Sequence, residues 1–204
     1  MSEIVSSPEE YFGRFIPDRD RLLIELEEEA HREEIPIVGP VVGELLFILV
    51  RATRARRILE LGTATGYSSI YLANACKPFD GHLLTLENNR LMASRARSNF
   101  KKAGLAERVE VRICDAMVEL PKIKDVFDFI FMDIDKEDYF PALTHLELLL
   151  KKNALLVVDN VGFKDAKAFN AAIAKHPAWA SVALFSYLPL HSPNHDGLCL
   201  AVRR

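Results

Sequence analysis

Acidic side chains occur at the ends of five successive short apolar segments: Glu60, Glu87, Asp115, Asp133 and Asp159. Carboxylates gathered in one place can hold a cation or bind the hydroxyl groups of a nucleoside. Each acid alone has a plainer interpretation, because strands end in polar residues and Asp often caps the next helix. Five in succession favour a functional site.

Three of the oxygen donors could share one cation. Asp133 ends one predicted strand, and Asp159 with Asn160 ends the next. Adjacent parallel strands lie about 4.8 Å apart, so these side chains can converge. Two carboxylates and one amide, without a nearby Cys or a paired-His motif, favour a hard cation such as Mg²⁺. The alternative is a hydrogen-bonded Asp–Asn strand end.

Lys136 follows Asp133 by three residues and is a candidate base. An exposed lysine has a pKa of about 10.4 and is a poor base at neutral pH. Next to a divalent cation, its ammonium form is disfavoured and the pKa falls. The alternative is a salt bridge from Lys136 to Asp133 or Glu137.

A glycine-containing turn joins the first predicted strand to a helix in the segment ELGTATGYS. Gly62 and Gly66 allow a tight turn and a close approach of the backbone to a ligand. Ala64 stands where a dinucleotide fingerprint has its middle glycine, which disfavours an NAD-dependent oxidoreductase. The turn better suits a cationic nucleoside that carries an amino acid. Glu87, at the end of the second strand, is placed to accept hydrogen bonds from ribose hydroxyls.

The elements that must position these residues alternate between strand and helix after a helical start. Pro8 follows Ser7 and precedes Glu9 and Glu10, a typical capped helix start. Apolar patterns predict strands over 58–61, 82–87, 109–113, 127–133 and 154–159, and then a hairpin over 181–187 and 198–202. Helices are predicted over 66–75, 89–103, 139–151 and 164–176.

This order predicts an α/β fold: a mostly parallel seven-stranded sheet, helices on both faces and a C-terminal antiparallel hairpin. Ligands bind such sheets beyond the carboxyl ends of the strands. We expect one domain over residues 1–204, with an N-terminal helical cap (1–54) and an α/β core (55–204).

Composition excludes several other classes. The chain has 204 residues, of which 50% are hydrophobic, and its net charge is −3. An acidic balance disfavours a nucleic-acid partner. Three widely spaced Cys disfavour a disulfide framework. The most apolar run, 35–50, falls short of the ~20 residues that a membrane span needs. The sequence therefore predicts a soluble cytoplasmic protein that binds neither nucleic acid nor membranes.

Three segments resemble a known family. ILELGTATGYSSIYLA resembles the first motif of S-adenosylmethionine-dependent methyltransferases, and FIFMDIDKEDY and LLVVDN resemble the cation-dependent O-methyltransferases of the catechol and caffeoyl-CoA type. The resemblance spans roughly residues 36–204. It implies a Rossmann-like class I methyltransferase fold, S-adenosyl-L-methionine as cofactor, a divalent cation and a homodimer.

The resemblance also implies roles for individual residues. The methionine end of the cofactor would be held by Glu60, Gly62, Thr63 and Ser68. Glu87 would bind the ribose, Asp115 and Ala116 would border the adenine, and Val38 belongs to a segment that closes over the cofactor. Asp133 would lie beneath the sulfonium while it also contacts the metal, which Asp159 and Asn160 complete. Lys136 would take the proton from the substrate hydroxyl.

The C-terminal segment departs from the family pattern. Asp196 and Gly197 match the family's usual D-G pair, and Asp196 is our candidate contact to the acceptor. The preceding stretch His-Ser-Pro-Asn-His is longer than usual. Its histidines, His191 and His195, are interpreted as incidental residues of a surface loop, with contact to the acceptor as the alternative.

The sequence therefore predicts methyl transfer from S-adenosylmethionine to a hydroxyl of a catechol-like small molecule chelated by the cation. Three alternatives remain at this stage. They are a methyltransferase of the same fold acting on RNA or another non-catechol acceptor, an NAD-dependent oxidoreductase, and a binding module that retains only the cofactor.

Overall fold

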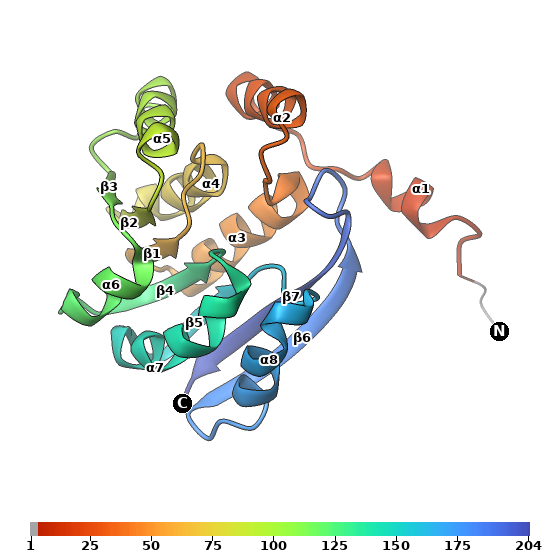
Figure 1. Ribbon diagram of the computed structural model, residues 1–204. Coiled ribbons are helices and arrows are strands. Elements are labelled where there is room, and N and C mark those ends of the chain that lie inside the picture. The colour runs from red at the N-terminus through yellow and green to blue at the C-terminus, as the bar shows by residue number, and fades with distance from the viewer. Residues whose placement is uncertain (1–3) are drawn as a thin grey trace.

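A computed structural model describes residues 4–204, and its centre is a seven-stranded sheet (Figure 1). The strand order is β3-β2-β1-β4-β5-β7-β6, and the first five strands of this order are parallel. The strands are β1 (Arg57–Leu61), β2 (His82–Glu87), β3 (Val109–Ile113), β4 (Phe127–Met132), β5 (Leu150–Val158), β6 (Trp179–Tyr187) and β7 (His195–Arg203). The α/β class, the mostly parallel sheet and the C-terminal antiparallel hairpin are confirmed.

Helices lie on both faces of the sheet (Figure 1). The α-helices are α1 (Pro8–Gly13), α2 (Arg21–Glu33), α3 (Gly39–Thr53), α4 (Tyr67–Cys76), α5 (Arg90–Lys102), α6 (Ala116–Glu119), α7 (Tyr139–Leu149) and α8 (Lys167–Ile173). Short 3₁₀ turns are η1 (Lys77–Phe79), η2 (Leu120–Lys122), η3 (Lys136–Asp138) and η4 (Lys164–Ala166).

Successive strand residues divide the apolar core into two layers. On β4, Phe129 packs with α3 and α4, whereas its neighbour Ile130 packs with α7 and α8. The same alternation separates Ile58 from Leu59 on β1. This period of two buries both faces of the sheet, which is why the strands contain few polar residues before they end. Because both faces of the sheet are apolar and buried, the polar side chains lie mainly at or beyond the carboxyl ends of the parallel strands.

Two predictions about local structure are wrong. The helix predicted over 139–151 ends at Leu149, because Leu150 is already extended and begins β5. Lys151 then reaches across to Asp128 of β4, with 2.6 Å between Nζ and Oδ1. Ser7 precedes α1, but its side chain makes no capping hydrogen bond. Within residues 4–204, no helix is long and apolar enough to cross a membrane.

Candidate active site

A cavity of about 300 Å³ opens beyond the carboxyl ends of β1, β2 and β4. With one exception, all the residues predicted to hold the cofactor line it: Val38, Gly62, Thr63, Ser68, Glu87, Asp115, Ala116 and Asp133. The exception is Glu60. Segments far apart in the sequence therefore meet where the topology of a parallel sheet places a ligand.

Gly62 lets two strand ends approach each other. Its φ is +94°, and a Cβ at this position would clash with the backbone carbonyl of Asp133. The amide of Asp133 in turn donates to the carbonyl of Leu61 at 2.9 Å. Only glycine fits this combination of positive φ and close backbone contact. The turn after β1 and the end of β4 are therefore held against each other.

Glu87 ties the turn after β1 to the end of β2. Its Oε2 accepts from the amides of Thr63 and Ala64 at 3.1 and 2.8 Å, and its Oε1 accepts from the amide of Asn89 at 2.8 Å. Ala64 has a φ of +46°, so this position of the turn adopts a left-handed conformation although it is not a glycine. The predicted ribose acceptor thus also shapes the loop beside it.

Glu60 lies one layer behind the cavity and is completely buried. Its Oε1 accepts from Ser68 Oγ at 2.7 Å, and its Oε2 accepts from Ser69 Oγ. Burial raises the pKa of Glu60 to about 7, while the serine hydrogen bonds oppose that rise. Glu60 reaches the cavity through Ser68, which does line it; direct cofactor contact by Glu60 stays a prediction.

Asp115 caps the short helix α6 at the far wall of the cavity. Its Oδ1 accepts from the amides of Met117 and Val118 at 2.7 and 3.2 Å. Ala116 follows directly and also lines the cavity. The capping interpretation of this acid is thus correct, and its position in the wall is compatible with the predicted adenine contact.

Tyr67 also lines the cavity, and sequence reasoning missed it. Its hydroxyl donates to Glu27 Oε1 of α2 at 2.6 Å, and the same carboxylate is paired with Arg19 at 2.9 Å. The N-terminal helix α2 is thereby connected to the cavity wall. No spacing within the motif around Gly62 signals this contact, because Glu27 lies forty residues earlier.

Lys136 lies at the cavity edge beside Asp133. Its Nζ donates to Asp133 Oδ1 at 2.9 Å and to the carbonyl of Ile134 at 3.1 Å. The aromatic rings of Tyr139 and Phe163 flank Nζ at 5.7 and 5.9 Å. The salt bridge that the sequence offered as an alternative is therefore present, and it holds Nζ at the rim of the cavity.

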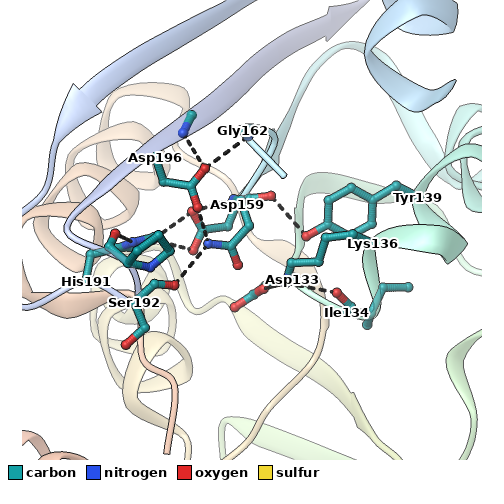
Figure 2. A network of polar contacts seen from close by, with 12 residues as sticks. Asp133, Ile134, Lys136, Tyr139, Asp159, Gly162, His191, Ser192 and Asp196 are labelled. Carbon is teal, nitrogen blue, oxygen red and sulfur yellow. Dashed lines mark hydrogen bonds and ion pairs between the residues drawn. The ribbon is translucent and has the colours of Figure 1, made fainter. Parts of the chain in front are cut away.

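Asp159 lies next to this pair (Figure 2), and neither Asp159 nor Asn160 lines the cofactor cavity. Burial and the charge of Asp159 raise the pKa of Asp133, and Lys136 lowers it. Asn160 donates from Nδ2 to Asp196 Oδ2 at 2.6 Å and to the carbonyl of Ser192 at 3.3 Å. Asp196, our candidate acceptor contact, is almost fully buried and does not line the cavity; contact with the acceptor stays a prediction.

His191 is the residue that the sequence interpretation placed wrongly. It is 4% exposed, and its Nε2 lies 3.0 and 2.9 Å from the two carboxylate oxygens of Asp159 (Figure 2). His195 fits the surface interpretation, since it is exposed and contacts Glu9 at 3.0 Å. Among residues 4–204, no group of three or more His, Cys, Asp and Glu side chains is arranged to hold a metal ion.

The doubly wound sheet, with its glycine turn and a cavity at the carboxyl edge, defines the class: a Rossmann-like class I methyltransferase. A protein family described as O-methyltransferase matches residues 17–176. The chain belongs to this family, as the catechol and caffeoyl-CoA motifs predicted, and the predicted enzyme class of S-adenosylmethionine-dependent O-methyltransferases is confirmed.

Individual relatives agree with this assignment. A catechol O-methyltransferase of Mycobacterium tuberculosis is 41% identical over 120 residues, which cover 58% of this chain and only 54% of that relative. One of Sus scrofa is 33% identical over 178 residues, covering 84% of this chain and 95% of that protein. The O-methyltransferase TomG of Streptomyces achromogenes, solved with SAM, superposes with a TM-score of 0.86 at 31% identity, covering 97% and 96% of the two chains.

Proposed function

We propose that this chain transfers the methyl group of S-adenosylmethionine to one hydroxyl of a catechol-like small molecule, with a divalent cation, Mg²⁺ in the first instance. The observation that carries the proposal is the Lys136–Asp133 pair at the cavity edge, next to Asp159 and Asn160. A base, a carboxylate-rich patch and a nucleoside-sized cavity are thereby adjacent. The names of the relatives support the acceptor class.

The cavity residues fit the proposed cofactor. Thr65 lines the cavity, and its hydroxyl is buried and has no hydrogen-bond partner within residues 4–204. A buried hydroxyl without a partner is costly, and a polar ligand would satisfy it. Glu87 would accept the ribose hydroxyls, and Asp115 and Ala116 would border the base. When bound, S-adenosylmethionine supplies a methyl group on a sulfonium leaving group.

The donor set also fits a hard divalent cation. Asp133 and Asp159 are close enough for one charge to raise the pKa of the other, an arrangement that a cation would stabilise. Asn160 has its amide nitrogen fixed by Asp196 and Ser192, which leaves its oxygen available. These three residues would hold the ion. When bound, such an ion lowers the pKa of a hydroxyl that coordinates it.

Lys136 would receive the proton that the acceptor hydroxyl loses. Its Nζ already points along the cavity rim, held by Asp133 and by the carbonyl of Ile134. Release of one proton from this ammonium would free a lone pair while both oxygen contacts keep the side chain in place. The chain's own contribution is thus to hold a proton acceptor next to the two reactants and to exclude water from them.

The test uses a panel of vicinal diphenols and their coenzyme A thioesters, assayed with Mg²⁺ and with excess EDTA. We expect transfer to at least one diphenol that chelator abolishes. Asp159→Ala should remove the metal-dependent rate and leave S-adenosylhomocysteine binding largely intact. Transfer that persists in excess chelator would contradict the cation, and equal loss of binding and rate would contradict the role of Asp159.

A homodimer without nucleic-acid or membrane partners is part of the same proposal. Helix α1 extends away from the rest of the molecule (Figure 1). Tyr11 and Phe12 on α1, and Phe15 in the turn after it, are 41%, 58% and 61% exposed. Exposed aromatic clusters are typical of contact surfaces. Light scattering coupled to size exclusion should give twice the chain mass, and a monomer at micromolar concentration would refute it.

A further inference from the structure

The segment between β6 and β7 carries a buried histidine onto a carboxylate of the proposed cation site. The side chains of His191 and Asp159 are each 1% exposed. The ring nitrogen Nε2 lies almost equally far from both carboxylate oxygens, at 3.0 and 2.9 Å. Such a contact on both oxygens leaves Asp159 little free coordination on that side.

The other ring nitrogen defines the charge of the histidine. His191 Nδ1 lies 2.6 Å from the carbonyl oxygen of Pro193, and a carbonyl oxygen can only accept. The carboxylate of Asp159 also accepts, so the ring donates from both nitrogens and carries a positive charge. Asp159 therefore already has a cationic partner.

The ring is held in place by its own loop. Ser192 donates from its amide to the carbonyl of Ile37 at 3.2 Å, and His191 donates from its amide to Leu188 at 3.0 Å. A Cβ on Gly39 would come within 2.8 Å of the backbone of Leu190 and His191. The loop thus rests on the segment before α3, part of which also lines the cofactor cavity.

We propose that His191 is a built-in competitor of the divalent cation: its ring occupies Asp159 until the ion displaces it. The inference rests on the cation of the proposed function and adds the residue that controls access to it. An ion that uses Asp159 and Asn160 must either take over the carboxylate oxygens from the imidazole or remain outside. The free energy needed to separate the buried His191–Asp159 pair then makes the binding free energy of the ion less favourable.

The test is Mn²⁺ binding to the full chain by isothermal titration calorimetry, for wild type, His191→Ala and His195→Asn. Removing the ring should tighten Mn²⁺ binding about tenfold. His195→Asn is the matched control, because this histidine borders the same loop but is exposed and contacts Glu9 and the ring of Tyr187 instead of Asp159. The Mn²⁺ affinity of this variant should equal that of wild type. In EDTA, His191→Ala should melt below wild type, since Asp159 loses its partner, and Mn²⁺ should recover most of that difference.

Equal or weaker Mn²⁺ binding by His191→Ala would overturn the competition. If His191→Ala does not fold, His191→Gln gives the same comparison, because it keeps a donor near Asp159 without the positive charge. Failure of the proposed function is separate: methyl transfer by wild type that resists EDTA would refute the cation itself. Transfer that is sensitive to EDTA, with Mn²⁺ affinity unchanged in the variants, would overturn only the role of His191.

Discussion

The proposed site has two sides that are built in different ways, one for the methyl donor (the donor side) and one for the cation and the methyl acceptor (the acceptor side). The donor side, around Gly62, Thr63 and Glu87, is shaped by backbone: a positive φ, a close carbonyl and amides that bind a carboxylate. The acceptor side, around Asp159 and Asn160, is shaped by side chains that arrive from a distant loop and strand. A positive φ or a close backbone contact restricts which residue can stand at that position, whereas a side-chain partner can come from any segment that reaches the site. The donor side should therefore be intolerant of small changes, and the acceptor side adjustable.

Lys136, where the two sides meet, should show the largest effect. Lys136→Met removes the proton acceptor and should lower the rate of methyl transfer about a thousandfold. Affinity for S-adenosylhomocysteine should remain near that of wild type, because the substitution leaves the hydrogen bonds between Glu87 and the turn after β1 in place. Single-turnover kinetics and calorimetry measure the two quantities. Lys102→Met, on the exposed surface of α5, is the control and should keep full activity; a loss below tenfold in Lys136→Met would refute the role.

Gly62→Ala tests whether backbone fit controls the donor side. The added methyl group meets the carbonyl of Asp133 at a φ of +94°, so we expect a loss of about 3 kcal/mol in unfolding free energy. Gly104→Ala is the matched control, since its φ is +67° but no atom lies within 4 Å of the added carbon. It should cost about 1 kcal/mol. Urea denaturation measures both, and equal losses would show that strain alone, without the contact, sets the cost.

Glu60 should give the donor side a characteristic dependence on pH. Its folded-state pKa is raised from 4.5 to about 7, so the stability it contributes is complete below pH 4.5 and is lost as pH rises through about 7. Glu60→Gln cannot ionise. We expect this variant to gain about 3 kcal/mol of unfolding free energy relative to wild type between pH 4.5 and pH 8. A difference between the two proteins that is independent of pH would contradict the raised pKa.

Glu87→Gln should have the smallest effect of the four. The variant loses the carboxylate charge that would bind the ribose hydroxyls and that accepts hydrogen bonds from the amides of Thr63 and Ala64. Affinity for S-adenosylhomocysteine should therefore fall about tenfold. Mn²⁺ affinity, which depends on the acceptor side, should not change. Calorimetry with each ligand measures this separation. A parallel loss of both affinities would show that the two sides are not independent.

The sequence predicted most of the residues that line the cavity on the donor side, because the structural requirements there are local. A short strand, a turn with two glycines and an acid at the next strand end lie within about thirty residues, and each has a physical reason. Glu60 does not line the cavity itself, and the sequence could not show this, since strand alternation indicates the face of a side chain but not its depth. The end of α7 was misjudged because Leu150 and Lys151 are stabilised by β4, a partner that helix periodicity cannot reveal.

The acceptor side was predicted only in part. Asp133, Asp159 and Asn160 could be named, because they end neighbouring strands. The residues that follow His191 do not indicate that its ring is buried, since Ser192, Pro193 and Asn194 are typical of a surface loop and are themselves exposed. The ring is buried because the loop folds back onto the segment before α3, a contact between residues more than 150 positions apart in sequence.

The hydrogen bond between Asn160 and Asp196 has a consequence for the order in which the enzyme assembles during synthesis. The two residues are separated by 36 positions, and Asp196 also accepts from the amide of Gly162 at 3.0 Å. At typical ribosomal rates, the nascent chain spends roughly 2–7 s with β1–β5 synthesised and this partner still missing. The donor side can fold during that interval. The end of β5 that precedes Asn160 is completed only when β7 pairs with it.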